Sequence, residues 1–150
     1  MKKQFDTPQL ILRGFEDLDL HAFYSMLDDN KKDGEVLDFN EVYKDFKNKE
    51  KSSNYYAIVL KKSMKVIGGL FVKKVNSTDY EIGYLINNSY KNIGYATEAL
   101  RGAVEELKPD GAKNIVALES SKSVKPFKLL ENEGFLSFND VYKVMCFFKD

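Results

Sequence analysis

Residues 80–99 read YEIGYLINNSYKNIGYATEA and join a strand pattern, a glycine-bearing loop and a helix pattern. Alternating apolar residues from Tyr80 to Ile86 predict a strand that carries those side chains on one face. Apolar residues then recur at helical spacing, which predicts a helix from Gly94 to about Lys108. The start of that helix is therefore expected close to the end of the strand.

The loop before this helix has the features of a phosphate-binding site. Backbone N–H groups in the first turn of a helix lack intrahelical partners, and the helix dipole adds partial positive charge there. Gly94 puts no Cβ in the way of a ligand, Lys91 adds a nearby cation, and Thr97 adds a hydroxyl donor. The loop matches neither the Walker sequence nor the Gly-x-Gly-x-x-Gly fingerprint. An ordinary strand–loop–helix connection is the alternative interpretation.

The opposite face of the predicted strand carries an acid beside open space. Glu81 and Gly83 share that face by the period of two, and glycine fills no volume next to the carboxylate. A half-buried carboxylate in this position could accept a proton from an ammonium group. Pairing of Glu81 with a neighbouring lysine explains the residue equally well.

Outward from this stretch, strand and helix patterns alternate along the chain without repeats or low-complexity tracts. We expect one domain over residues 1–150, in which one mixed sheet is covered by helices. The predicted strands are 10–13, 55–60, 66–72, 80–86, 114–118, 135–138 and 141–148, and the predicted helices are 17–29, 39–47, 94–108 and 123–133.

The composition is that of a soluble globular domain, with 43% hydrophobic and 31% charged residues among 150. A net charge of zero argues against a nucleic-acid binder that neutralises phosphates. One histidine and one cysteine argue against a metal site. The start of the chain does not read as a secretory signal, and no apolar run is long enough to span a bilayer. We therefore expect a cytoplasmic protein without membrane partners.

At residues 91–96 the sequence resembles the GNAT acetyltransferase superfamily, and within it the RimJ/RimL-type ribosomal-protein N-acetyltransferases. Lys-Asn-Ile-Gly-Tyr-Ala stands where the superfamily has Arg/Gln-x-x-Gly-x-Gly/Ala. Residues 10–15 and 129–135 resemble two further segments of the subgroup. The resemblance implies the α/β GNAT fold, a mixed and mostly antiparallel sheet of six to seven strands with helices on both faces. It also implies that the fourth and fifth strands, 80–86 and 114–118, splay apart.

The resemblance further implies acetyl-CoA as cosubstrate and no metal. Pantetheine would run along the fourth strand, and the pyrophosphate would lie on backbone amides at the start of the following helix. The implied cofactor contacts are Tyr84, Leu85, Ile86, Lys91, Asn92, Ile93, Gly94, Tyr95, Ala96, Thr97, Ser123 and Lys128.

The implied chemistry is direct transfer of the acetyl group to a primary amine. Glu81 is the expected base, and a backbone N–H near Leu85 is the expected donor to the oxyanion. Three positions depart from the family pattern. Lys91 replaces the usual Arg or Gln, Ser123 replaces an Asn, and Leu130 occupies the place of a tyrosine general acid.

These features predict an N-acetyltransferase that acts on an amine-bearing small molecule or a protein N-terminus, as a monomer or homodimer. A catalytically degenerate coenzyme A sensor or interaction module is the main alternative, and a different α/β nucleotide binder is the third. Acidic residues on and beside the first helix could attract a cationic acceptor such as a polyamine, or could form a solvated face. They are Glu16, Asp17, Asp19, Asp28 and Asp29.

Overall fold

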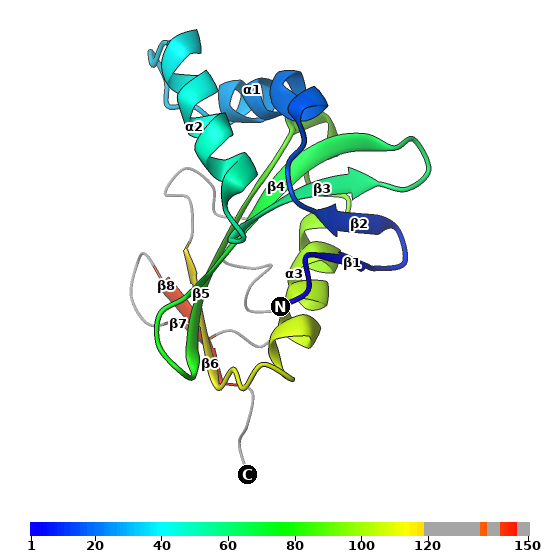
Figure 1. Ribbon diagram of the computed structural model, residues 1–150, viewed down its shortest axis with the longest axis vertical. Helices are drawn as coiled ribbons and strands as arrows, with labels where there is room; N and C mark the ends of the chain where they lie inside the picture. The colour runs from blue at the N-terminus through cyan, green and yellow to red at the C-terminus, as the bar shows by residue number, and fades with distance from the viewer. Residues whose placement is uncertain (119–135, 138–141, 147–150) are drawn as a thin grey trace.

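The computed structural model describes residues 1–118, 136–137 and 142–146, which form one curved sheet with helices on both faces (Figure 1). The strand order is β1-β2-β3-β4-β5-β6-β8-β7. The strands are β1 (Gln4–Asp6), β2 (Leu10–Arg13), β3 (Tyr55–Leu60), β4 (Lys65–Lys74), β5 (Asp79–Ile86), β6 (Asn114–Leu118), β7 (Leu136–Ser137) and β8 (Tyr142–Cys146). The helices are α1 (Leu20–Asp29), α2 (Phe39–Lys51) and α3 (Tyr95–Leu107), with 3₁₀ turns η1 (Asp17–Asp19) and η2 (Asn88–Tyr90).

The predicted mixed, mostly antiparallel sheet is confirmed. Every described strand pair is antiparallel except β5 and β6, which run parallel because α3 crosses over between them. The strands number eight within the described residues, rather than six to seven, because Gln4–Asp6 pairs with β2. This short edge strand buries a single side chain, Phe5, and so leaves almost no periodic signal in the sequence.

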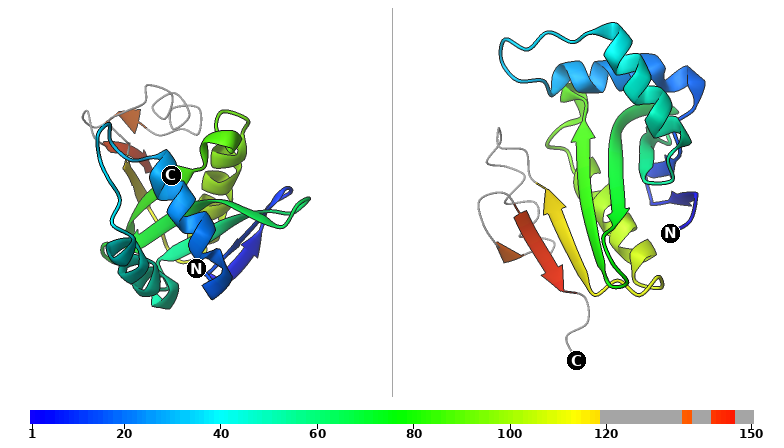
Figure 2. Two further views of the ribbon diagram at one scale, coloured as in Figure 1. Left: turned by 90° about the horizontal axis from the view of Figure 1, so that it is seen from above. Right: turned by 60° about the vertical axis from the view of Figure 1, so that its left-hand side comes forward.

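Two separate apolar cores lie on the two faces of the sheet. Figure 2 shows the ribbon of α3 on the opposite face of the sheet from α1 and α2. On one face, buried side chains of α3 such as Leu100 and Leu107 pack against residues such as Ile82 of β5. On the other face, Phe23 of α1 and Phe46 of α2 pack together with their ring centroids 5.4 Å apart. The sheet therefore separates the environment of α3 from that of α1 and α2.

The two longest helices form where the sequence indicates, with adjusted ends. The carboxylate of Asp38 accepts hydrogen bonds from the N–H groups of Asn40 and Glu41, and this caps α2. Lysines in the last turn favour extension of α2 to Lys51, beyond the predicted end at residue 47. The predicted first helix begins as the 3₁₀ turn η1, and α1 proper starts at Leu20.

A cluster of hydrogen bonds fixes the first turn of α3 to the turn between β1 and β2. The carboxylate of Glu98 accepts from the hydroxyl of Thr7 at 2.5 Å and from the backbone and side chain of Gln9 at 2.8 and 2.9 Å. Lys61 donates to the carbonyl of Thr7 at 2.7 Å. One end of α3 is therefore held against the N-terminal hairpin.

The predicted helix over residues 123–133 lies outside the described residues, as do Ser123, Lys128 and Leu130. The short strands β7 and β8 fall within the two predicted C-terminal strands and pair with each other. Within the described part of the chain, no helix is both long and apolar enough to cross a bilayer.

Candidate active site

The candidate site begins where β5 and β6 part. Their parallel pairing ends at Ile82 and Ala117, whereas β5 continues to Ile86 in unbroken pairing with β4. Among the described strands, residues 83–86 of β5 therefore pair with β4 on one side and have no partner on the β6 side. This is the splay expected between the fourth and fifth predicted strands.

Two hydrogen bonds fix the direction of every peptide group in β5. The N–H of Asn87 donates to the carbonyl of Ile67 at 2.8 Å, and the N–H of Val75 donates to the carbonyl of Asp79 at 2.9 Å. Asp79 begins β5 and Asn87 directly follows it, and both are odd-numbered. The pairing of β5 with β4 between these two residues has no register shift. Because an antiparallel strand turns alternate residues to alternate sides, odd residues bond to β4 and even residues face β6.

Because of this alternation, the N–H of Leu85, the expected oxyanion donor, does not face the gap between β5 and β6. The peptide of Leu85 faces β4, and its carbonyl lies so close to Gly68 that an added Cβ there would be 2.3 Å away. The N–H of Leu85 thus points into the ladder with β4 rather than into the gap. The N–H groups directed toward the β6 side belong to Tyr84 and Ile86.

The start of α3 lies beyond the same end of β5. Asn92 and Gly94 both have left-handed backbones, with φ of 64° and 96°. Gly94 is the N-cap residue and has no side chain to cap the helix, in contrast to Asp38 at the start of α2. A Cβ added at Gly94 would meet nothing within 4 Å. The first N–H groups of α3 are therefore reached through an exposed turn, 92–94.

The structure brings the predicted loop residues Lys91 to Thr97 together at this end of α3. The ring of Tyr95 is buried and packs near Tyr90, with ring centroids 6.4 Å apart, so only its backbone faces the turn. Ala96 packs against the core, and the side chain of Ile93 is 59% exposed.

Asn30, which the sequence did not mark as a site residue, and Asp29, which it marked only as a possible acceptor-attracting acid, anchor the end of β5 to α1. The side-chain amide of Asn30 donates to the carbonyls of Met26 and Ile86, at 2.8 and 3.1 Å. The carboxylate of Asp29 accepts from the N–H of Asn88 at 2.8 Å. The sequence signal was the pair Asp-Asn directly after an apolar helical stripe, which is typical of a helix end.

Glu81 and Gly83 share the face of β5 that looks toward α1 and α2. Glu81 is partly exposed, and Lys73 of β4 stands directly across from it in the register. A Cβ added at Gly83 would meet only the ring of Phe71, at 3.9 Å. Lys73 is therefore placed where it could form an ion pair with Glu81. The open space at Gly83 is what a role of Glu81 as base requires.

A cavity of about 160 Å³ lies on this face beside the end of β5. Phe15, Phe23 and Met26 form one side, and Tyr55 and Phe71 form another. Its remaining wall includes residues 83–85 of β5, where that strand leaves β6. An apolar space therefore opens next to the strand segment that is expected to hold the thioester.

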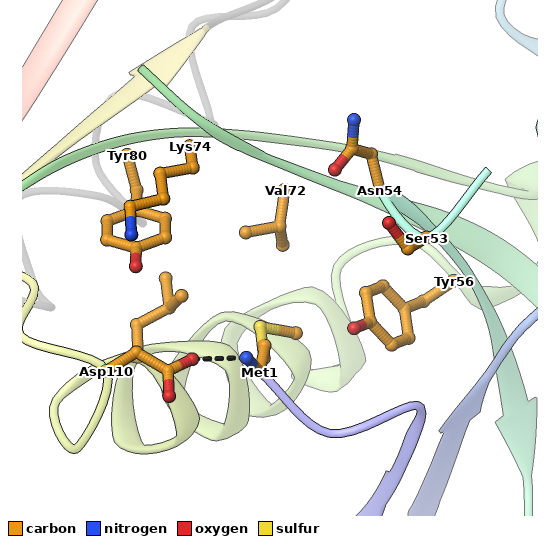
Figure 3. A pocket seen from close by; sticks show the side chains of 9 residues that line it. Met1, Ser53, Asn54, Tyr56, Val72, Lys74, Tyr80 and Asp110 are labelled. Atoms are coloured by element: carbon orange, nitrogen blue, oxygen red, sulfur yellow. Dashed lines mark hydrogen bonds and ion pairs between the residues drawn. The ribbon is translucent and has the colours of Figure 1, made fainter. Parts of the chain in front are cut away.

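A larger cavity of about 350 Å³ lies at the other end of α3 (Figure 3). Leu107 and Asp110 line it from the helix end, and Lys74 and Tyr80 line it from the sheet. The 13 residues of α3 separate it from the turn at Gly94 by about 20 Å. This cavity is therefore not part of the candidate site.

Comparison with known proteins identifies the family. The acetyltransferase (GNAT) domain family matches residues 9–135. The uncharacterized N-acetyltransferase YnaD of Bacillus subtilis (strain 168) is 30% identical over 135 residues, which cover 85% of this chain and 79% of that protein.

Solved structures share the fold at low sequence identity. A GNAT-family acetyltransferase from Bacillus anthracis superposes with a TM-score of 0.83 at 18% identity, covering 95% of this chain and 98% of that chain. The ribosomal-protein-S5-alanine acetyltransferase from Vibrio fischeri superposes with a TM-score of 0.69 at 15% identity, covering 97% of each chain. The family match spans β2, the parting strands and the turn at Gly94, so the chain belongs to the GNAT acetyltransferases and is an acyltransferase.

Proposed function

We propose that this protein transfers the acetyl group of acetyl-CoA to a primary amine. The observation that carries the proposal is the open, glycine-capped start of α3 beyond the end of β5, where β5 has left β6. A helix start of this kind binds a phosphate, and a strand edge without a sheet neighbour accepts an extended ligand. Both features are needed for a long cosubstrate that carries a pyrophosphate at one end.

The residues at the start of α3 fit a pyrophosphate. The first intrahelical bond of α3 is donated by the N–H of Glu98 to the carbonyl of Gly94, at 3.0 Å. The three preceding N–H groups, of residues 95–97, therefore have no partner within the helix. The ammonium of Lys91 adds a positive charge, as a point charge rather than the planar fork of an arginine.

The edge of β5 fits the pantetheine arm and the reacting carbonyl. Acetyl-CoA supplies an acetyl group already activated as a thioester. Backbone groups of Tyr84 and Ile86 face the side of β5 on which it would lie. An N–H on this side, rather than that of Leu85, is the proposed donor to the negative charge that develops on the carbonyl oxygen.

Glu81 is the proposed base. It lies two residues before Gly83 on the same face, a spacing of about 7 Å along a strand, which one water molecule can bridge. A C–N bond forms between the amine and the acetyl carbon, and the C–S bond of the thioester breaks. The amine proton passes through water to Glu81, and the leaving sulfur takes up a proton from water to become the thiol.

The acceptor on this proposal is a small-molecule amine or a protein N-terminus. The name of the Vibrio fischeri protein supports the second possibility and a RimJ/RimL-like subgroup, but only through a shared fold. The cavity beside Gly83 supports the first.

Gly94→Ala tests the cosubstrate site. Alanine at φ 96° strains the turn by about 1 kcal/mol or more and puts a methyl group in the path of the pyrophosphate. We expect calorimetry to show acetyl-CoA binding to the wild type and at least tenfold weaker binding to Gly94→Ala. A thiol-release assay over a panel of amines measures transfer.

Gly111→Ala is the matched control. Gly111 is also left-handed, with φ of 88° and open space around it, but it follows the far end of α3. The same strain there leaves acetyl-CoA affinity unchanged. Absence of acetyl-CoA binding at millimolar concentration refutes the proposal, and binding without turnover of any amine favours a coenzyme A-binding module instead.

A further inference from the structure

The cavity beside β5 is lined almost entirely by apolar and aromatic groups. The rings of Tyr55 and Phe71 lie 5.0 Å apart on one side, and Phe15 and Phe23 meet edge to face at 5.5 Å on another. At about 160 Å³ the space matches the size of an apolar protein cavity, about 150 Å³, that holds one benzene ring. One ring or one branched aliphatic group of similar volume fills it.

Charge in this cavity is limited to one lysine among the described lining residues. The ammonium of Lys49 lies 2.5 Å from the carboxylate of Asp45 and 4.9 Å from the ring centroid of Tyr55. Asp45 itself does not line the cavity. A ligand that carried a second ammonium group would therefore meet the like charge of Lys49, with no carboxylate among the described lining residues to pair with it.

The acidic residues that could attract a polyamine are engaged elsewhere. Asp17 pairs with Lys47, Asp19 with Arg13 and Asp28 with Lys31, at 2.7, 2.7 and 2.8 Å. Asp29 holds the N–H of Asn88, and Glu16 lies 3.8 Å from Arg13. None of these carboxylates lines the cavity.

The cavity also orients what it holds. Gly83 and Leu85 belong both to its wall and to the part of β5 that has left β6. A group seated among the aromatic rings has its attached amine at this wall, next to the strand edge proposed for the thioester. The spacing from Gly83 to Glu81 then puts the amine within reach of the proposed base through one water.

We propose that the acceptor is a monoamine whose body is one compact apolar group, aromatic or branched aliphatic, and that polyamines are poor acceptors. The proposal rests on the proposed acetyl transfer and names the substrate class of that same site. The transfer step is unchanged: a C–N bond forms, the C–S bond breaks, one proton moves from nitrogen through water to Glu81, and the leaving sulfur takes up a proton from water.

The test compares three amines of similar length with the purified full chain. Phenethylamine and 3-methylbutylamine carry the compact apolar group, and 1,5-diaminopentane carries a second ammonium. We expect kcat/KM from thiol release to be about 100-fold higher for the first two amines. Saturation transfer from the protein to the ring protons of phenethylamine reports occupancy of the cavity without turnover.

Gly83→Ala tests whether this cavity selects the amine. The added methyl group meets only Phe71, at 3.9 Å, so it enters the cavity without straining the fold. We expect the ratio of kcat/KM for phenethylamine to that for ethylamine to fall about tenfold, and saturation transfer to weaken. Gly14→Ala adds the same methyl group where nothing lies within 4 Å, and the wild-type ratio is expected there.

The outcomes separate this inference from the function on which it rests. If acetyl-CoA binds and 1,5-diaminopentane is acetylated faster than phenethylamine, the substrate class is wrong and the acetyl transfer stands. The class is also wrong if both alanine variants change the ratio equally, or if phenethylamine shows neither saturation transfer nor turnover. If acetyl-CoA does not bind, the proposed function fails and this inference fails with it.

Discussion

At the scale of single residues, Glu81 is the side chain on which the proposed chemistry depends most. It shares a strand face with Gly83, where the cavity opens, and it stands across from Lys73. A general base contributes about 10²- to 10⁴-fold to a rate, whereas an ion pair on a partly exposed strand contributes little. The two roles therefore predict very different effects of a Glu81 substitution on the rate of acetyl transfer.

Glu81→Gln distinguishes them. We expect kcat for acetyl transfer to fall by at least about 100-fold, because the amide cannot take up the amine proton, with acetyl-CoA affinity kept. Glu41→Gln is the control, since Glu41 is an exposed glutamate of α2. A rate for Glu81→Gln within twofold of the wild type assigns Glu81 to the ion pair.

Leu85 shows the limit of sequence reasoning at this scale. The alternating pattern predicts which face each side chain of β5 occupies, and the buried Tyr80, Ile82 and Ile86 agree with it. It does not say to which edge each peptide N–H points, because that depends on the register with β4. A shift of one residue therefore moves the proposed oxyanion donor from Leu85 to its neighbours.

At the scale of elements, the end of α1 sets the position of the end of β5. Asn30 joins the two by donating from one amide to carbonyls of both, and Asp29 adds a bond to the next turn. The bonds to Ile86 and Asn88 each join residues more than 50 positions apart in the sequence. A single sequence contains no signal for such a pairing, although it shows that a helix ends there.

Asn30→Ala tests this link. Loss of both side-chain bonds is expected to lower the free energy of unfolding by about 1–3 kcal/mol in urea titrations. Because the end of β5 leads into the loop proposed to bind the cosubstrate, acetyl-CoA affinity is expected to fall as well. Asn40→Ala, at an exposed position of α2, serves as control, and equal effects of the two variants contradict the link.

At the scale of the whole molecule, the sequence pattern predicts the fold more fully than it predicts the candidate site. Within the described residues, the order of strands β2 to β6, the helices α1 to α3 and the apolar stripe of α3 were predicted from the sequence, because burial repeats with the period of each element. The edge strand β1 was not, since it buries one side chain. Its place depends on distant contacts, including those of Thr7 and Gln9 with Glu98.

Those contacts predict a pH dependence of global stability. Burial alone would raise the pKa of Glu98, but hydrogen bonds from Thr7 and Gln9 and the charge of Lys61 lower it overall from 4.5. The folded state thus binds this proton more weakly than the unfolded chain. The stabilisation is present above pH 4.5 and is lost as the pH falls through the lower folded pKa.

Urea unfolding of the wild type and Glu98→Gln at several pH values measures this effect. The wild type is expected to be the more stable protein at pH 7, and the difference is expected to shrink below pH 4.5. A difference that stays constant from pH 7 to pH 3 shows that the charge of Glu98 does not contribute.

The separation of the two apolar cores by the sheet has a consequence for divergence among descendants of such a chain. Substitutions in the aromatic cluster of Phe15, Phe23 and Phe46 alter the side proposed to face the acceptor, while Leu100 and Leu107 behind the sheet keep their surroundings. Substitutions in one apolar core thus leave the packing of the other core unchanged. Acceptor specificity can therefore change in descendants while the proposed binding of the acetyl donor is kept.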